Sequence, residues 1–279
     1  MYCTLIDCTT LAQHLDDPHW ALVDCRYDLM DTDAGRVHYL AAHVPRAVYA
    51  HLDEDLSGPP LVVGGRHPLP AAEHLRALFG YWGIDARTQV VVYDASGGSF
   101  CARAWWLLRY MGHTAVAVLD GGWPHWQAGG LPVSSGPELR PMVYFHGEPS
   151  DDRWVGAEQV PAARCLIDSR DPARYRGEHE PIDKAAGHIP GALNRFWKDN
   201  LGGDGRFLAP ATLRGALLGY LRTVPADEAV FYCGSGVTAC HNLLAAVHAG
   251  LPEPRLYPGS WSEWCSDPAR PIETGASRR

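Results

Sequence analysis

The sequence contains no stretch that is long and apolar enough to cross a membrane. Its longest apolar runs, such as residues 89–93 (QVVVY), are far shorter than the roughly 18 residues that a spanning helix needs. Residues 1–7 have no basic region, no sustained apolar stretch and no small-residue cleavage site, which argues against secretion. We therefore expect a cytoplasmic protein without a membrane segment.

Clusters of positive charge are also missing. Lysine and arginine are scattered along a chain whose formal net charge is −8, so we expect no basic surface of the kind that binds nucleic acid. An anionic substrate would have to be attracted by a local positive site. With 46% hydrophobic residues and no low-complexity segment, the composition instead fits a globular protein.

The cysteines lack the spacing of a metal site. No closely spaced Cys or Cys/His pairs repeat as they do in zinc fingers, so we expect no metal. A protein of this length without a secretion signal does not need disulfides, and we expect mostly reduced thiols in the core. The eight cysteines are Cys3, Cys8, Cys25, Cys101, Cys165, Cys233, Cys240 and Cys265.

An internal duplication organises the 279 residues, a length that suits two domains. Four short sequence motifs recur in the same order in both halves, and such an ordered set indicates a duplicated domain. The matched segments are 22–26 (LVDCR) with 166–170 (LIDSR), 43–47 (HVPRA) with 188–192 (HIPGA), 91–94 (VVYD) with 230–233 (VFYC), and Trp123/Trp126 with Trp261/Trp264.

Each half alternates short β-type runs with helical patterns, which predicts an α/β fold with a parallel sheet flanked by helices on both faces. Pro, Ser and Gly concentrate in residues 131–137, ahead of an irregular stretch that reaches Asp152. We predict a first domain at 1–136, a linker at 137–152 and a second domain at 153–279. The pattern predicts helices at 70–83, 101–111, 211–221 and 237–248, and strands at 90–93, 115–119, 229–232 and 255–257.

One strand-to-helix loop carries a thiol. The strand at 229–232 runs into Cys233, two glycines let the backbone turn tightly, and residues 237–240 open the next helix. Ligands of parallel α/β sheets bind at such points, where loop amides and the helix N-terminus favour a thiolate over a thiol. Cys233 is therefore a candidate nucleophile. The alternative is a buried core thiol beside an ordinary turn.

The first half lacks this thiol. Asp94 stands at the position that matches Cys233, and residues 95–99 (ASGGS) follow it. A duplicated loop that survives without its thiol indicates a single active site, in the second half.

The loop from Cys233 to Cys240, CGSGVTAC, resembles the active-site loop of 3-mercaptopyruvate sulfurtransferases, members of the tandem-domain rhodanese family. The resemblance implies two tandem rhodanese-like domains. The second would be catalytic, and the first, without a catalytic Cys, would form part of the cleft wall. It implies no cofactor and no metal. Supporting motifs lie at 93–96 (YDAS), 120–123 (DGGW), 187–192 (GHIPGA) and 259–264 (GSWSEW).

The resemblance also implies a mechanism. Cys233 would attack the outer sulfur of a small anionic donor and carry it as a persulfide, whose negative charge the loop N–H groups stabilise. An acceptor, which could be cyanide, a small thiol or a thioredoxin-like protein, then removes the sulfur. The hydroxyls of the loop would donate hydrogen bonds to the persulfide or substrate, with turn formation or helix capping as the alternative. The residues placed around the sulfur are Gly234, Ser235, Gly236, Val237 and Thr238.

Three residues outside the loop match family positions. Arg174 matches the arginine that binds the anionic end of the donor, a task suited to a guanidinium fork. Asp53 and His67 match first-domain residues that reach the cleft. Arg170 has a twin, Arg26, in the thiol-free half, which indicates a structural corner rather than a substrate contact.

The chain departs from the family pattern at the donor site. Mercaptopyruvate-type members have a second arginine nine residues after the first, where this chain has Asp183, and Lys184 is the candidate replacement. Thiosulfate-type rhodaneses place basic residues directly after the catalytic Cys, whereas a neutral pair follows Cys233 here. The neutral loop favours mercaptopyruvate as the donor, with a thiosulfate-preferring enzyme as the alternative. We expect Cys240 to be a core thiol rather than a disulfide partner of Cys233.

Two other functions compete with sulfur transfer. Phosphatases with a similar loop need an arginine six positions after the Cys, and Ala239 stands there. A non-catalytic binding module needs no thiol, which fits the first half but not the loop around Cys233. The sequence therefore predicts a sulfurtransferase and does not specify its oligomeric state.

Overall fold

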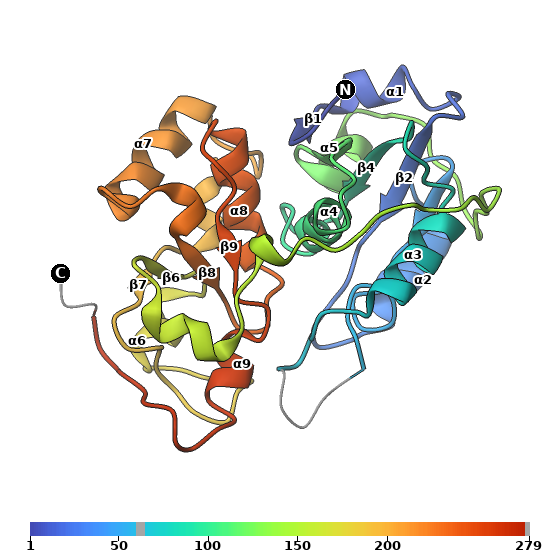
Figure 1. Ribbon diagram of the computed structural model, residues 1–279. Helices are drawn as coiled ribbons and strands as arrows, with labels where there is room; N and C mark the ends of the chain where they lie inside the picture. Colours follow the sequence, from blue (N-terminus) through green and yellow to red (C-terminus); the bar gives the residue numbers. More distant parts are fainter. Residues whose placement is uncertain (60–64, 277–279) are drawn as a thin grey trace. The chain divides into compact units, whose positions relative to one another are not determined.

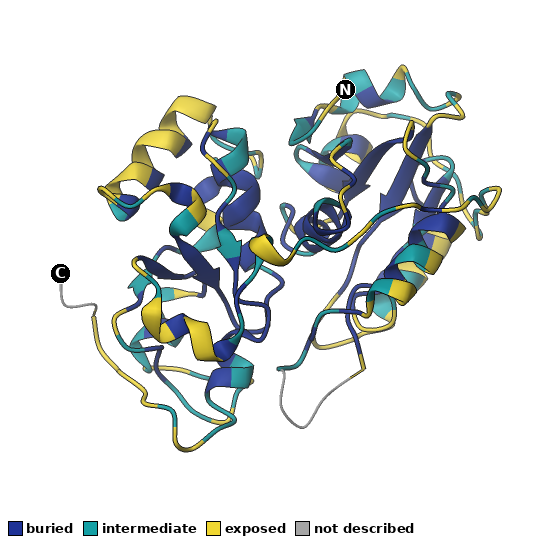
Figure 2. Ribbon diagram, in the orientation of Figure 1, coloured by how far each residue is buried: buried dark blue, intermediate teal, exposed yellow. Residues whose placement is uncertain are grey.

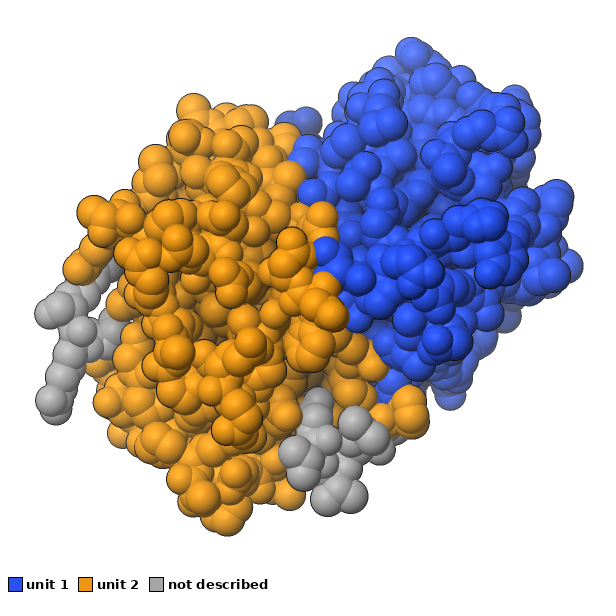
Figure 3. Space-filling view, viewed as in Figure 1, with its two compact units in different colours: residues 1–58, 70–150, 203–206 blue, residues 59–69, 151–202, 207–279 orange. Residues whose placement is uncertain are grey.

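The computed structural model describes residues 1–59 and 65–276, and the chain divides into two compact units, coloured separately in Figure 3. The short segment 65–69 belongs to the second unit although it precedes most of the first in the sequence. Unit 1 comprises residues 1–58, 70–150 and 203–206, and unit 2 comprises residues 59–69, 151–202 and 207–279.

Unit 1 is built on a five-stranded sheet of order β1-β5-β4-β2-β3, in which all neighbouring strands are parallel (Figure 1). The central strands are buried along their whole length and mostly apolar because both faces of the sheet are covered, as Figure 2 shows. Asp24 and Tyr93 pair in register at the carboxyl ends of neighbouring strands. The strands are β1 (Leu5–Ile6), β2 (Trp20–Asp24), β3 (Ala47–Tyr49), β4 (Gln89–Tyr93) and β5 (Val116–Leu119).

Helices cover both faces of this sheet. Val91 and Tyr93 share a core cluster with Leu11 of α1 and Trp126 of α5. Because side chains alternate along a strand, Val92 faces the opposite side, where α4 packs against β4 and β5. The helices are α1 (Cys8–Ala12), α2 (Ala34–Ala41), α3 (Ala72–Tyr81), α4 (Cys101–Tyr110) and α5 (Gly122–Ala128).

Unit 2 repeats this design on a four-stranded parallel sheet of order β7-β6-β8-β9. Tyr232 at the end of β8 shares a core cluster with Trp261 of α9, while α8 packs on β8 and β9 and against α7. The strands are β6 (Leu166–Asp168), β7 (Leu193–Asn194), β8 (Val230–Tyr232) and β9 (Arg255–Leu256), and the helices are α6 (Pro172–Arg176), α7 (Pro210–Leu221), α8 (Ala239–His248) and α9 (Ser260–Trp264). Four short 3-10 turns are η1 (Asp151–Arg153), η2 (Ala157–Ala162), η3 (Trp197–Asn200) and η4 (Ala226–Glu228).

The predicted α/β class is confirmed, and each predicted helix and strand is present within one or two residues of its expected ends. The helix predicted at 70–83 is α3, which buries Leu75 and Phe79 as its apolar spacing requires. The helix predicted to open at Val237 begins instead at Ala239. In the described part of the chain, no helix has the length and apolarity needed to span a bilayer.

The duplication extends to a buried ion pair at the carboxyl end of β2 in unit 1 and of β6 in unit 2. In unit 1 the Asp24 carboxylate accepts hydrogen bonds from Arg26 (2.6–3.0 Å) and from the hydroxyl of Tyr93 (2.8 Å). The guanidinium carbon of Arg26 lies 4.6 Å from the ring centre of Trp123. Unit 2 repeats the ion pair with Asp168 and Arg170 (2.7 Å), and the Arg170 guanidinium lies 4.7 Å from the ring centre of its own tryptophan, Trp261.

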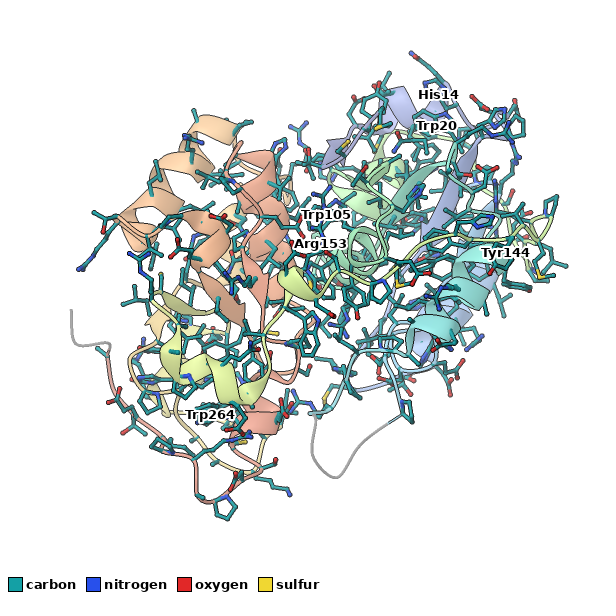
Figure 4. All side chains as sticks on the ribbon, in the orientation of Figure 1. His14, Trp20, Trp105, Tyr144, Arg153 and Trp264 are labelled. Carbon is teal, nitrogen blue, oxygen red and sulfur yellow. The ribbon has the colours of Figure 1, made fainter. Side chains whose placement is uncertain are left out.

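The segment 137–150 is extended and irregular, yet it packs against unit 1. The N–H of Val143 donates to the carbonyl of Gly80 (3.0 Å), and Phe145 is buried edge-on against Phe79, with ring centres 5.1 Å apart. Tyr144, labelled in Figure 4, is exposed. Exposed and buried side chains alternate along this stretch, so it packs against unit 1 and is not a freely solvated linker.

Candidate active site

Cys233 lies directly after β8 in unit 2, at the carboxyl end of the sheet. The residue is buried (1% exposed), and its backbone is held at both ends. Its N–H donates to Oγ of Ser260 (3.1 Å), and its carbonyl accepts from the N–H of Trp261 (3.1 Å). The thiol is therefore fixed at the start of the loop that leads to α8.

Gly236 makes the tight turn before α8. Its φ of +76° is left-handed, and a Cβ on Gly236 would lie 2.3 Å from the carbonyl oxygen of Pro258, so no other residue fits the turn. The next turn is closed by i→i+3 bonds, from the N–H of Cys240 to the carbonyl of Val237 (3.1 Å) and from the N–H of His241 to the carbonyl of Thr238 (3.2 Å). The α-helix therefore starts only at Ala239. Thr238 precedes it, and its half-buried side chain makes no capping bond.

In unit 1 the matching loop encloses a carboxylate. The Asp94 side chain is buried and accepts four hydrogen bonds from backbone N–H groups of its own loop. Such a ring of amides stabilises negative charge. The donors are Ser96 (2.8 Å) and Gly98 (2.9 Å) to Oδ1, and Phe100 (2.9 Å) and Cys101 (3.0 Å) to Oδ2.

The loop after Cys233 presents the same amides without the carboxylate. Asp94 and Cys233 are 139 positions apart (233 − 94), and the same offset matches the first three donors to Ser235, Val237 and Ala239. Within the described residues, no group accepts a hydrogen bond from these three N–H groups, although all three residues are buried. Buried amides without acceptors are rare, and here they belong to the loop that follows Cys233 at the carboxyl end of the sheet.

His67 lies at this loop, and its predicted role in substrate binding stays a prediction. Its Nδ1 is 2.7 Å from Oγ of Ser235, and both residues are buried. The segment that carries the histidine is held on α9, because the N–H of Arg66 donates to Oγ of Ser262 (3.1 Å). The structure thus brings together two residues that are 168 positions apart in the sequence.

Two guanidinium groups border the other side of the loop. A Cβ on Gly234 would lie 3.0 Å from Nη2 of Arg66 and 3.6 Å from Nη1 of Arg174. Arg174 binds Glu180 through Nε and Nη2 (3.1 and 2.6 Å) and Asp183 through Nη2 (3.1 Å). Arg66 donates through Nη1 to the same Asp183 carboxylate.

A family model for the rhodanese-like domain matches the chain twice, over residues 7–129 and 153–267. The chain belongs to the rhodanese family. A probable 3-mercaptopyruvate sulfurtransferase of Pseudomonas aeruginosa is 47% identical, over 97% of this chain and 98% of the relative. The thiosulfate sulfurtransferase of Mus musculus is 34% identical, over 95% of this chain and 92% of the relative.

Solved structures agree with the sequence relatives. SseA from Escherichia coli, described with the 3-mercaptopyruvate sulfotransferases, has a TM-score of 0.80 at 30% identity, with 94% of this chain and 100% of SseA covered. The predicted family and the tandem rhodanese fold are therefore confirmed. The named relatives are sulfurtransferases of both donor types.

The remaining predicted positions of this rhodanese fall outside the loop. Asp53 is exposed in unit 1, where its carboxylate accepts a hydrogen bond from the hydroxyl of Tyr27 (2.5 Å), so its predicted role stays a prediction. Lys184 is exposed. Cys240 is buried in α8, with its Sγ donating to the carbonyl of Gly236 (3.4 Å). Arg170 is committed to Asp168, in agreement with its predicted structural role.

The thiols near the centre of the unit 1 sheet differ from Cys233 in their surroundings. Burial raises the pKa of Cys25 well above its usual range, and burial together with the negative charge of Asp94 does the same to the pKa of Cys101. No disulfide joins any of the eight cysteines, all of which lie in the described ranges. Cys25 and Cys101 are packing residues, as the composition predicts for most of the cysteines.

Two residues at the rhodanese loop were not predicted. Ser260 has a φ of +54°, although it is not glycine, and its hydroxyl accepts from the Cys233 amide and donates to the carbonyl of Tyr257 (2.9 Å). At the matching position of unit 1, Gly122 has the same φ. The other is Arg66, the residue before His67. The one sequence signal for it was an acidic residue, Asp183, at a position where the family has an arginine.

Proposed function

We propose that this rhodanese is a sulfurtransferase that carries a sulfane sulfur as a persulfide on Cys233, with 3-mercaptopyruvate as the donor. One observation carries the proposal: the loop that follows Cys233 holds three N–H groups of buried residues without acceptors, and its twin encloses the Asp94 carboxylate. The twin loop demonstrates that this backbone arrangement accommodates an anion. In unit 2 the anion would be the terminal sulfur of the persulfide.

The transfer is balanced without an oxidant or a cofactor. The Cys233 thiolate attacks the sulfur of mercaptopyruvate, an S–S bond forms and the C–S bond breaks, and its electron pair leaves with carbon as pyruvate enolate. The sulfhydryl proton neutralises the enolate, so that pyruvate and an anionic persulfide remain. The amides of Ser235, Val237 and Ala239 would stabilise that anion. With thiosulfate, the same attack would release sulfite.

The loop residues have separate roles in this proposal. Gly234 leaves room for the donor beside the guanidinium groups, and Gly236 makes the turn that aligns the amides with the thiol. The hydroxyl of Ser235, oriented by His67, and the hydroxyl of Thr238 would donate to the sulfur or the substrate. Val237 contributes its amide.

Arg174 would bind the carboxylate of the donor. Its Nε and Nη2 are occupied by acidic side chains, whereas Nη1 faces the loop at Gly234. Asp53, in the first domain, would contribute to substrate binding as the family pattern implies.

The donor preference follows from charge. Basic residues next to the catalytic Cys would suit a dianion, but Gly234 and Ser235 are neutral. A donor with one carboxylate therefore fits better than thiosulfate. Comparison of kcat/KM for 3-mercaptopyruvate and thiosulfate tests this preference, and a clear preference for thiosulfate would overturn it.

Intact-mass spectrometry tests the persulfide itself. After incubation with donor, the protein should gain about 32 Da, the mass of one sulfur atom, and the gain should disappear with a reducing thiol. Cys233→Ser should lose the adduct and the turnover while remaining folded. The matched control is Cys240→Ser, seven positions further on, which should keep both. A wild-type protein with neither adduct nor turnover would instead support a binding module.

The remaining features of the proposal concern partners and layout. The acceptor would be cyanide, a small thiol or a thioredoxin-like protein, because each can attack the outer sulfur of a persulfide, and the setting would be cytoplasmic. We assign residues 1–136 to the thiol-free domain, 137–152 to the linker and 153–279 to the catalytic domain. The linker falls in the gap between the two family matches, which end at residue 129 and resume at residue 153.

A further inference from the structure

Asp183 holds two arginines at once. Its Oδ1 accepts from Nη1 of Arg66, and its Oδ2 lies 3.1 Å from Nη2 of Arg174. The Asp183 side chain is only 4% exposed, whereas those of Arg66 and Arg174 are 31% and 18% exposed. A buried carboxylate that bridges two partly exposed guanidinium groups fixes their mutual orientation.

The nitrogen atoms that Asp183 does not use face the catalytic loop. Nη2 of Arg66 and Nη1 of Arg174 donate to no described group of the protein, and they are the two atoms nearest to a Cβ on Gly234, at 3.0 and 3.6 Å, followed by Nη2 of Arg174 at 3.7 Å. Two –NH₂ groups without acceptors thus converge beside the residue that follows Cys233. This is the arrangement that a carboxylate accepts in a bidentate fashion.

We infer that Arg66 is the second arginine of the donor site, that it binds the donor carboxylate together with Arg174, and that Asp183 is the positioning residue for both. The inference rests on the proposed sulfurtransferase function and defines its substrate class as thiol donors with a single carboxylate. The guanidinium group that the family places nine residues after Arg174 reaches the loop here from a distant segment of the chain. At position 183, where the family has that arginine, this chain has the aspartate that pairs with Arg66 and Arg174.

The environment of Arg66 supports this role. Burial and the neighbouring cation of Arg174 lower the pKa of Arg66, while the negative forms of Cys233 and Glu180 raise it. The guanidinium therefore lies within electrostatic range of the reacting sulfur. Its backbone is fixed as well, because a Cβ on Gly65, where φ is +81°, would lie 2.6 Å from the carbonyl oxygen of Gly259.

The net charge of the arginines and carboxylates beside the loop favours a donor with a single negative charge. Each of the three arginines here, Arg66, Arg170 and Arg174, contacts at least one of the three carboxylates of Asp168, Glu180 and Asp183. The formal charge of the cluster is zero before the donor binds. Two directed –NH₂ groups can still recognise one carboxylate by geometry, but there is no surplus charge for a dianion such as thiosulfate.

The test compares two donors and two variants. Arg66→Gln should raise KM for 3-mercaptopyruvate by about 10- to 100-fold with little change in kcat, the usual loss for a charged hydrogen bond. It should leave turnover of the neutral carboxamide analogue unchanged, a result that a misfolded loop would not give. Lys184→Gln is the matched control and should behave as the wild type with both donors.

A charge exchange provides the second arm. Arg66→Asp and Asp183→Arg should each raise KM for 3-mercaptopyruvate, and the double variant, which returns an arginine to position 183, should recover at least about tenfold. Equal KM in wild type and Arg66→Gln, or equal losses with the carboxylate and carboxamide donors, would overturn the inference. If the wild type forms no persulfide with any donor, the proposed function and this inference both fail. If it forms one and KM does not depend on Arg66, only the inference fails.

Discussion

Nδ1 of His67 lies 2.7 Å from Oγ of Ser235, so an imidazole from an early segment of the chain orients a hydroxyl in the loop of the reactive thiol. Both groups are buried, and the hydroxyl has one proton to give. If the imidazole accepts that proton, the hydroxyl oxygen can receive another from the substrate. If the imidazole donates, the hydroxyl can donate to the sulfur. Either way the two residues act as one unit.

His67→Ala and Ser235→Ala should therefore each lower kcat by about 10- to 100-fold, and the double variant should be hardly worse than either single variant. The reason is that each substitution removes the same oriented hydroxyl. Steady-state kinetics of the three variants with 3-mercaptopyruvate would check this. Multiplicative losses in the double variant would contradict a shared role.

Ser260→Gly should lower activity while leaving the stability of the protein nearly unchanged. A φ of +54° costs serine roughly 1 kcal/mol of conformational energy, and glycine avoids that cost. This gain offsets the loss of the two hydrogen bonds that the Ser260 hydroxyl makes. Thermal stability should stay within about 1 kcal/mol of the wild type, while sulfur transfer should fall about tenfold because the Cys233 amide loses its acceptor. Ser260→Ala keeps the strained backbone without the hydroxyl and should be the less stable variant. The reverse order of stability would show that the conformation is not strained.

Asp94→Ala should destabilise unit 1 without affecting chemistry in unit 2. Four loop N–H groups would lose their acceptor in a buried site, at a cost of about 3 kcal/mol. Urea unfolding followed by tryptophan fluorescence measures that loss. The amount of Cys233 persulfide formed under native conditions should equal that of the wild type. A variant as stable as the wild type would mean that the amides find other partners.

The stability of the protein should fall as the pH falls below about 6.5. Burial lowers the pKa of His113 in unit 1 and of His188 in unit 2 from the ordinary value of 6.5, so the unfolded chain binds these protons more readily than the folded protein. Between that value and the lower folded pKa, the unfolded state gains protons and stability is lost. Above it, both imidazoles are neutral in both states.

Urea midpoints between pH 8 and pH 5 would measure this dependence. The paired variants His113→Gln and His188→Gln should each flatten the acidic side of the profile relative to the wild type, because each removes one depressed titration. An acidic slope as steep as that of the wild type in both variants would assign the effect to other groups.

Local sequence signals were sufficient for the loop and not for its surroundings. A strand, two glycines and a helix within twelve residues indicated Cys233, and the first half of the duplication has the matching loop at Asp94. The start of α8 was misplaced because the turn after Gly236 is closed by i→i+3 bonds, a difference from the α-helix that apolar periodicity does not report.

Arg66 was missed because its partner Asp183 is 117 positions away, and ion pairs at that separation leave no pattern in the sequence. Ser260 was missed for a different reason. Serine is common before helices, and only the backbone angle distinguishes this one from an ordinary cap. The burial of Phe145 was equally invisible, since the stretch around it has the composition of a linker.

The assignment of residues 65–69 to unit 2 has a consequence for how this protein could have evolved from a duplicated ancestor. A gene fragment that encodes only the second half would supply the reactive sulfur but neither the guanidinium of Arg66 nor the imidazole of His67. The second unit is therefore completed by a segment that the first half of the duplicated sequence encodes. If Arg66 binds the donor as proposed, the second half alone would form the loop around Cys233 without the whole of its donor site.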